Sequence, residues 1–275
     1  MYEVVFRRLL VRLEAADPGR WVVKGGVALL LRLDPNRTSD DIDLTYLHAV
    51  GKHAIAIAAL ERAFAIDTGD FFYFALDPVA AAAEPVDDET IELPVIASIG
   101  DRPFIHFSID LGRPALDVPS EPLCPRAALT GLDAVDALPL LRALALATQV
   151  GQKVCAMFER HGAQASPSSR ARDLVDVAMI AMQVETLGAA EIISAVRHEE
   201  RLRLARKTLH APLPPRFVLH DDQARDWRAR WARATRQVPI SFDEAFVIAE
   251  ALLTPVLAGT ASGVWRPVQR RWHAP

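Results

Sequence analysis

The chain has 275 residues, of which 51% are hydrophobic and 24% charged, and its net charge is −4 at pH 7. This composition is typical of a globular protein with a sizeable core, and it excludes a chain that is basic throughout, as many nucleic-acid binders are. The two cysteines, Cys124 and Cys155, form no disulfide framework, which fits a reducing cytoplasm. Because no run of 18 apolar residues occurs, we expect no membrane span and a cytoplasmic location.

The first 120 residues have the pattern of a small α/β domain. Hydrophobic periodicity and turn residues predict helices over 3–14, 27–33 and 53–64 and strands over 21–23, 41–46, 71–75, 91–99 and 104–111. Arg7, Arg8 and Arg12 form the polar side of the first helix. The segment Gly100–Pro103 predicts a hairpin turn between the last two strands.

Residues 121–275 have a different, helical pattern. We expect helices over about 139–160, 170–186, 189–208, 221–236 and 242–258, followed by an irregular tail over 263–275. The predicted fold class is therefore an α/β (α+β) N-terminal domain with a small mixed sheet over residues 1–120. An all-helical C-terminal domain over residues 121–275 follows it.

A motif in the first domain carries the clearest chemical signal. Gly25 and Gly26 follow a short apolar strand, and Asp41 and Asp43 stand two residues apart in another strand. Residues i and i+2 of a strand point to the same side, so the two carboxylates project together and repel each other. A cation relieves this repulsion, and Mg²⁺ prefers carboxylate oxygens together with substrate phosphates. A glycine turn that leads into a helix offers backbone N–H groups to phosphates. The motif therefore indicates metal-dependent chemistry on a nucleotide.

Asp110 offers a third carboxylate near the end of the predicted strand 104–111. Together with Asp41 and Asp43 it makes a two-metal site possible, in which the metals activate the attacking oxygen and steady the leaving pyrophosphate. The alternative is that Asp110 is an ordinary acid at a strand end.

These residues resemble a known superfamily. Gly25-Gly26, Arg37-x-Ser39-x-Asp41-x-Asp43 and a strand acid are similar to the signature of the DNA polymerase β-like nucleotidyltransferases. Gln152-Lys153-Val154 and Arg170-x-Arg172-Asp173-Leu174-Val175-Asp176 narrow the resemblance to AbiEii/AbiGii-type nucleotidyltransferase toxins. That family includes mycobacterial toxins that add nucleotides to tRNA. The resemblance covers roughly residues 20–185.

The resemblance implies a two-lobed protein with the nucleotide between an α/β lobe and a helical lobe. Asp41 and Asp43 would hold Mg²⁺, Ser39 would bond a phosphate oxygen, and Lys153 would reach the triphosphate. Asp173 would complete the polar site. Asp176 lies three residues further on the same helix and can share that face, so the choice between these two acids stays open. Gly25, Gly26 and Arg37 are the further residues expected at the nucleotide, although Arg37 has the alternative of bracing its own loop.

Two features outside the motif bear on the partners. Lys153 lies in an apolar helical stretch, where an ammonium must reach solvent or find an anion. Between Arg197 and Arg236 there are 11 Lys/Arg and 5 Asp/Glu, a local net charge of +6, which indicates either a polyanion-binding surface or a solvated helix face. Trp227 and Trp231 in that segment are either RNA-stacking residues or core.

The sequence therefore predicts a Mg²⁺-dependent nucleotidyltransferase, the toxin of a toxin–antitoxin or abortive-infection pair. It would transfer nucleotides from a nucleoside triphosphate to the 3′ end of a tRNA, and an antitoxin protein would be its partner. Two alternatives stay open: transfer to a protein or small molecule, and a non-catalytic regulator that only binds nucleotide.

Overall fold

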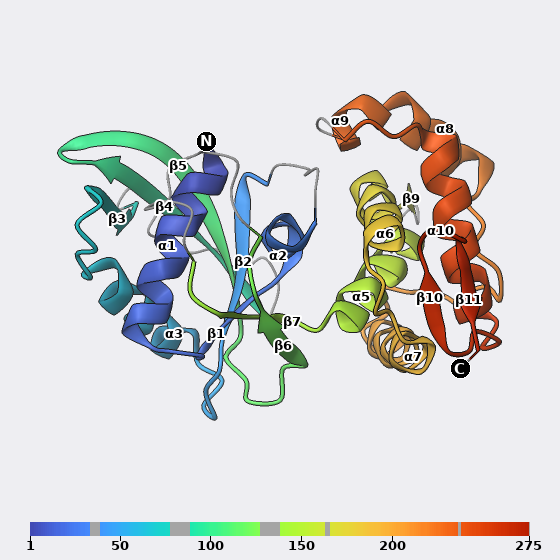
Figure 1. The fold of residues 1–275 in the computed structure, drawn as a ribbon, viewed down its shortest axis with the longest axis horizontal. Helices are drawn as coiled ribbons and strands as arrows, with labels where there is room; N and C mark the ends of the chain where they lie inside the picture. Colours follow the sequence, from blue (N-terminus) through green and yellow to red (C-terminus); the bar gives the residue numbers. More distant parts are fainter. Residues whose placement is uncertain (34–38, 78–88, 127–137, 163–165, 236–237, 275) are drawn as a thin grey trace. The chain divides into compact units, whose positions relative to one another are not determined.

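The computed structural model describes residues 1–33, 39–77, 89–126, 138–162, 166–235 and 238–274 (Figure 1). It divides into two compact units, the first made of residues 1–32 and 38–144 and the second of residues 33–37 and 145–275. Arg37, one of the predicted nucleotide-binding residues, lies outside the described residues. Within the described part of the chain, no helix is long and apolar enough to cross a membrane.

Unit 1 is built on a seven-stranded mixed sheet with the order β3-β4-β5-β2-β1-β7-β6. Its elements in chain order are α1 (Tyr2–Ala16), β1 (Trp21–Val23), α2 (Gly25–Arg32), β2 (Asp41–Tyr46), α3 (His53–Phe64), β3 (Phe72–Leu76), β4 (Thr90–Ile99), β5 (Arg102–Gly112), β6 (Ser120–Leu123) and β7 (Leu141–Leu144). Strand β2 pairs parallel with β5 and β1 parallel with β7, whereas the other neighbours are antiparallel.

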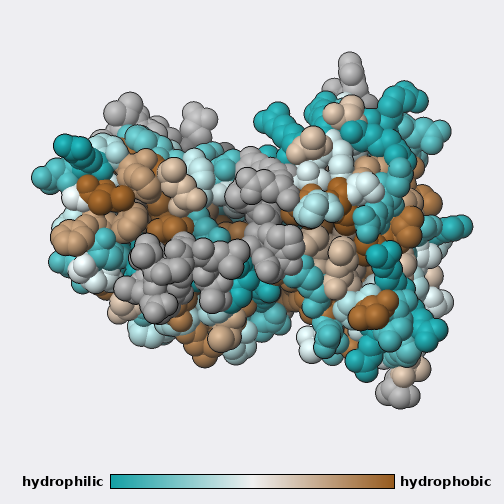
Figure 2. All heavy atoms as spheres, turned by 45° about the horizontal axis from the view of Figure 1, so that its top comes forward, coloured by the Kyte–Doolittle hydropathy of each residue, from teal (hydrophilic) through white to brown (hydrophobic). Residues whose placement is uncertain are grey.

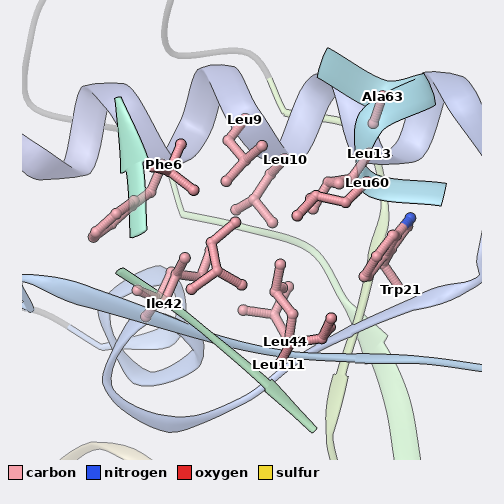
Figure 3. Packing of buried hydrophobic residues seen from close by; sticks show 14 of the residues in the cluster. Phe6, Leu9, Leu10, Leu13, Trp21, Ile42, Leu44, Leu60, Ala63 and Leu111 are labelled. Carbon is pink, nitrogen blue, oxygen red and sulfur yellow. The ribbon is translucent and has the colours of Figure 1, made fainter. Parts of the chain in front are cut away.

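The core of unit 1 lies between the sheet and the helices α1 and α3. Figure 3 shows apolar side chains from these elements pointing toward one another: Phe6, Leu9, Leu10 and Leu13 of α1, Leu60 and Ala63 of α3, and Trp21, Ile42, Leu44 and Leu111 of the strands. All of them are buried. The side chains that alternate with these strand residues therefore point to the other face of the sheet.

The arginines of α1 are buried rather than solvated, in contrast to the polar side that the sequence predicts. Arg12 donates to Asp70 Oδ1 and to the carbonyl oxygen of Phe72, each at 2.6 Å, and Arg8 donates to Asp70 Oδ2 at 2.7 Å. Burial raises the pKa of Asp70, but the Arg12 guanidinium and the backbone N–H of Phe72 outweigh it and hold this pKa well below its usual range. The network fixes the turn before β3 against α1.

One end of the sheet of unit 1 exposes several large apolar side chains. Phe71, Tyr73, Ile99 and Phe104, from the start of β3 and the turn between β4 and β5, are exposed. Figure 2 shows brown and tan side chains at this end, on the left of the view. Phe71 adopts a left-handed backbone with φ of 61°, which is uncommon for an aromatic residue.

Unit 2 is mainly helical. Its elements are α5 (Leu146–Phe158), β8 (Arg160–His161), β9 (Ser166–Pro167), α6 (Ala171–Gln183), α7 (Ala189–Ala205), α8 (Asp221–Ala229), α9 (Trp231–Thr235), α10 (Phe242–Leu257), β10 (Val264–Arg266) and β11 (Arg271–His273). The prediction of an all-helical domain is wrong, because β8–β9 and β10–β11 form two small antiparallel sheets. The segment predicted as an irregular tail holds one of them, in which Trp265 is fully buried.

The structure also corrects the region around the predicted domain boundary at residue 120. Strands β6 and β7 belong to the sheet of unit 1, so this unit extends to Leu144. The predicted helix 139–160 is wrong at its beginning, because Leu141–Leu144 form a strand that pairs parallel with β1, and the helix starts at Leu146. Pairing with a distant strand overrides the local helical pattern of this apolar segment.

Candidate functional site

Strand β2 presents the acidic pair as the alternation predicts. Ile42 and Leu44 are fully buried in the core, whereas Asp41 is exposed and Asp43 is partly exposed. Since successive side chains of a strand point to opposite faces, both carboxylates lie on the face of the sheet opposite α1.

Asp110 joins this pair through the register of the sheet. In the parallel ladder of β2 and β5, Asp43 is the partner of Asp110 and Asp41 is the partner of Ser108. Neighbouring strands lie about 4.8 Å apart, so the three carboxylates share one small area. Burial, followed by the charges of Asp43, Asp41 and Glu92, raises the pKa of Asp110 to about 6, whereas Lys24 acts in the opposite direction.

Glu92 and Ser108 are polar residues of this face that the motif does not contain. Glu92 is the partner of Asp110 across the antiparallel pair β4–β5, and Ser108 Oγ donates to Glu92 Oε1 at 2.5 Å. The proximity of Glu92 to Asp110 could have been predicted from the sequence, because the hairpin turn at Gly100–Pro103 places residue 92 near residue 110 once the two strands are aligned. The acidic face therefore continues across a third strand.

The glycine turn places the beginning of α2 directly against Asp43. Gly25 has φ of +56°, and a β-carbon at this position would lie 1.8 Å from Asp43 Oδ2. The backbone N–H of Lys24 donates to the carbonyl oxygen of Asp43 at 2.9 Å. Helix α2 starts at Gly25 and includes Gly26, two residues earlier than predicted. The first turn of a helix carries N–H groups that the helix itself cannot pair, and such groups favour anions.

Ser39 lies beside the acidic pair. Its side chain is buried, and its Oγ donates to Asp41 Oδ1 at 2.6 Å. The structure thus gives Ser39 a role in orienting Asp41. The predicted bond from Ser39 to a phosphate oxygen stays a prediction.

The remaining predicted site residues meet in unit 2. Lys153 of α5 donates to Asp173 Oδ1 at 3.0 Å and to Asp176 Oδ2 at 2.6 Å, and all three side chains are buried. Arg170 Nε donates to Asp173 Oδ2 at 2.8 Å from the start of α6. The ammonium of Lys153 therefore pairs with both candidate acids, which lie on one face of α6.

Both tryptophans and several arginines after residue 196 have partners within unit 2. Trp227 is fully buried and donates to the carbonyl oxygen of Ser168 at 2.8 Å, while Trp231 belongs to the next helix and donates to that of Ile240 at 2.8 Å. Arg228 pairs with Asp243 at 2.6 Å and Arg230 with Asp226 at 2.8 Å. Trp227 thus follows the core alternative rather than RNA stacking.

The chemistry of the donor set in unit 1 fits a divalent cation shared with a substrate. Among the described residues, no group of three or more His, Cys, Asp or Glu side chains is arranged to hold a metal ion by itself. Mg²⁺ commonly takes one or two carboxylates and fills its remaining positions with water and substrate phosphates. The adjacent carboxylates and the raised pKa of Asp110 mark an area where added positive charge is favourable.

The chain is similar to several known proteins. The model of the family described as "Nucleotidyl transferase AbiEii toxin, Type IV TA system" matches residues 8–247. No curated protein matches the chain. Among solved structures, MenT4, a nucleotidyltransferase toxin from Mycobacterium tuberculosis H37Rv, is similar with a TM-score of 0.56 and 18% identity, covering 95% of this chain and 93% of the other.

Two structures from Helicobacter pylori also resemble the chain. JHP933 has a TM-score of 0.47 and 14% identity, with 94% of this chain and 93% of the other covered. A protein titled a putative nucleotidyltransferase has a TM-score of 0.47 and 13% identity, with 99% and 97% covered.

Proposed function

This chain belongs to the AbiEii family of nucleotidyl transferase toxins of type IV toxin–antitoxin systems, and from that premise we propose its cofactor and its substrates. The enzyme uses Mg²⁺ and transfers a nucleotide from a nucleoside triphosphate to the 3′ end of a tRNA. Membership in a toxin–antitoxin family also implies a cognate antitoxin. Since triphosphates and tRNA are cytoplasmic molecules, the proposed reaction takes place in the cytoplasm.

The observation that carries the proposal is the acidic face of unit 1 beside the beginning of α2. Asp43 and Asp110 are partners across β2 and β5, and Gly25 brings α2 against Asp43. Carboxylates that take metal ions and a helix start that takes phosphates are thus adjacent. A nucleoside triphosphate with its Mg²⁺ would place the metal at the carboxylates and the phosphates at the start of α2.

The proposed reaction is an in-line displacement at the α-phosphorus. The acceptor hydroxyl oxygen forms a bond to this phosphorus, the bond to the bridging oxygen of the β-phosphate breaks, and pyrophosphate leaves. The hydroxyl proton passes to the carboxylate of Asp110, which lies beside Asp43 in the sheet. Positioning and charge neutralisation supply most of the rate.

The three acids of unit 1, Ser39 and the buried cluster of unit 2 have roles in this proposal. Asp41, Asp43 and Asp110 would hold Mg²⁺, which would neutralise charge on the triphosphate. Ser39 fixes the Asp41 carboxylate for this purpose. In unit 2, Lys153 is the proposed cation for the phosphates, with Asp173 and Asp176 holding its ammonium.

The choice of tRNA as the acceptor is supported by the family resemblance and by the net charge of the segment from Arg197 to Arg236. Several of its arginines have acidic partners, but the segment as a whole keeps an excess of positive charge. Positive charge favours a nucleic acid over a neutral metabolite.

A direct test incubates the protein with each of four α-³²P-labelled triphosphates, Mg²⁺ and total tRNA. We expect the tRNA to become labelled. Labelling should be absent when the 3′ end of the tRNA has been oxidised with periodate, with Asp41→Asn, or without divalent metal. Asp101→Asn, in the exposed β4–β5 turn, is the matched control and should label like wild type. Label in protein or metabolite fractions alone would identify the acceptor as a protein or a small molecule. Tight nucleotide binding without pyrophosphate release would indicate a non-catalytic regulator.

A further inference from the structure

A pocket of about 280 Å³ lies entirely within unit 2, where the end of α5, strand β9, residues 209–220 and the start of α8 meet. Its lining is mainly apolar and includes the ring of Phe158 and the prolines Pro212 and Pro214. This volume is at the lower end of the range for pockets that bind small molecules. A single ring system therefore suits the pocket better than a peptide does.

The walls of this pocket are held in place by the protein itself. The backbone N–H of Leu213 donates to Oε1 of the buried Glu200 at 2.6 Å, which anchors the proline-rich wall. Phe158 packs edge to face against the buried ring of Phe217, with 5.9 Å between the ring centroids. Proline also fixes the backbone φ angle. Binding in this pocket therefore requires little ordering of its walls.

Gln223 gives the pocket a buried hydrogen-bond acceptor. Its side chain lines the pocket and the residue is only 4% exposed. Its Nε2 donates to the carbonyl oxygens of Met157 at 2.8 Å and of Ser168 at 3.5 Å. Because carbonyl oxygens only accept, these bonds fix which end of the carboxamide is oxygen. None of the described residues donates to this Oε1, and a buried acceptor without a donor is unfavourable. A ligand with an N–H group would satisfy it.

The charges around the pocket are compatible with an anionic ligand. Among the described residues that line it, the only acid is Glu159, and the guanidinium of Arg203 pairs with Glu159 Oε1 at 2.6 Å. Arg160, His210 and His220 belong to the same lining. The pocket therefore carries no uncompensated acid that would repel the phosphates of a nucleotide.

The pocket adjoins the buried cluster of Lys153 on two sides. Met157, which lines the pocket, follows Lys153 by four residues on α5, so the two lie on one helix face about 6 Å apart. Ser168, whose carbonyl oxygen accepts from Gln223, also accepts through its Oγ from the backbone N–H of Arg170 at 3.3 Å. This spacing is comparable to the one that a ribose imposes between a base and its phosphates.

We propose that this pocket receives the base of the nucleoside triphosphate and that Gln223 Oε1 accepts a hydrogen bond from an amino group of the base. The inference rests on the proposed function, because it concerns the nucleotide whose phosphates Lys153 binds in that proposal. Adenine, guanine and cytosine carry an amino group, whereas uracil flanks its one ring N–H with two carbonyl oxygens. The pocket therefore favours ATP, GTP and CTP over UTP, by about fivefold for one hydrogen bond.

Binding without catalysis tests the pocket directly. The four ribonucleoside triphosphates and inorganic tripolyphosphate, which has no base, are titrated calorimetrically into the protein in EDTA. Ala211 is an exposed residue of the lining, so the ring of Ala211→Phe fills the pocket from its surface. We expect Ala211→Phe to weaken ATP, GTP and CTP about tenfold and to leave tripolyphosphate within about twofold of wild type. Ala232→Phe, on the exposed side of α9 and outside the lining, should bind like wild type.

Three results of these titrations would overturn the inference. Ala211→Phe could bind nucleotides as well as Ala232→Phe does, which would mean that no base enters the pocket. It could weaken tripolyphosphate as much as the nucleotides, which would assign the effect to the phosphates. Equal affinity of wild type for all four nucleotides would remove the role of Gln223.

Kinetics of tRNA labelling distinguish this inference from the proposed function. Ala211→Phe should raise the KM for the triphosphate about tenfold and leave kcat within about twofold. Val218→Trp, at another position of the lining that is 47% exposed, is a second variant in case Ala211→Phe does not fold. A rise in the KM for tRNA alone would overturn the assignment to the triphosphate. If wild type transfers no nucleotide, the proposed function fails, while the titrations in EDTA still decide whether a base enters the pocket.

Discussion

Asp43 and Asp110 are partner residues across the parallel strands β2 and β5, although 66 positions separate them in the sequence. Each strand alone offers an alternating pattern with an acid on its open side. Only the register of the sheet brings the two acids together. The start of α2 lies against the same acids, because the backbone of Gly25 is next to the Asp43 carboxylate. The acids and the helix start therefore depend on one another, and substitutions can separate their contributions.

Gly25→Ala should abolish transfer with only a modest loss of stability. The new methyl group would lie 1.8 Å from Asp43 Oδ2, so the carboxylate must leave its position. The positive φ adds a backbone cost of about 1 kcal/mol. Gly19→Ala is the matched control, because Gly19 also has a positive φ, +68°, but nothing lies within 4 Å of the added carbon.

The measurement is kcat/KM of tRNA labelling together with the midpoint of thermal unfolding. We expect a loss of at least 100-fold for Gly25→Ala and normal activity for Gly19→Ala, with similar midpoints. Equal activity of the two variants would mean that Asp43 tolerates displacement.

Asp110→Asn should stabilise the metal-free protein at neutral pH. The pKa of Asp110 is raised to about 6 from an ordinary value of 3.8, mainly by burial. A carboxyl group whose pKa is raised in the folded state contributes stability below pH 3.8, and this contribution is lost as the pH rises through 6. Asparagine carries no charge at any pH, so it avoids this loss. After a discount for solvent screening, the gain at pH 7.5 is about 1 kcal/mol.

Urea unfolding in EDTA at pH 7.5 and pH 4.5 tests this prediction. The stability difference between Asp110→Asn and wild type should be present at pH 7.5 and shrink toward zero at pH 4.5. A difference that is independent of pH would assign the effect to packing rather than to charge.

Elements with strong local signals were predictable from the sequence. The bounds of β2 and α3 are as predicted, because alternation over 41–46 and an Ala-rich periodic run over 53–64 suffice to specify them. The acidic pair follows from the same alternation. Local pattern also places Lys153 in an apolar helix, and in the structure its counter-ions are the two acids that the resemblance left open.

Features that depend on distant partners were not predictable. Leu141–Leu144 is a strand because β1 pairs with it. Arg12 can be buried because its guanidinium pairs with the carboxylate of Asp70, 58 residues away. Neither pairing can be predicted from the residues that surround Leu141–Leu144 or Arg12 in the sequence. Trp265 likewise ends inside unit 2 because its indole reaches the carbonyl oxygen of Ala181 at 2.7 Å. The same reasoning explains why Glu92 joins the acidic residues only through the register of the sheet.

Lys153→Met should destabilise unit 2 more than a surface substitution does. The substitution leaves Asp176 without the ammonium that lies 2.6 Å from it, while Asp173 retains Arg170. Breaking a buried ion pair by removing one member commonly costs about 3 kcal/mol. Adding Asp176→Asn should recover part of this loss, because it removes one of the two buried negative charges.

Chemical denaturation of Lys153→Met, Asp176→Asn, the double variant and Lys52→Met measures these terms. Lys52→Met controls for the loss of an exposed lysine and should stay within about 0.5 kcal/mol of wild type. If Lys153→Met is as stable as Lys52→Met, the buried cluster contributes nothing to the fold.

Gly151→Ala tests how closely α5 and α7 must approach each other. A β-carbon at Gly151 would lie 3.0 Å from the carbonyl carbon and oxygen of Ala195 and 3.1 Å from Val196 N. These are backbone atoms of α7, so the helices must separate to admit the methyl group. The gain of about 1 kcal/mol from helix propensity is opposed by an overpacking cost of about 1–3 kcal/mol. We therefore expect a net loss of stability, read by urea unfolding. Ala147→Gly on the same helix calibrates the propensity term, and a Gly151→Ala variant more stable than wild type would show that α7 yields freely.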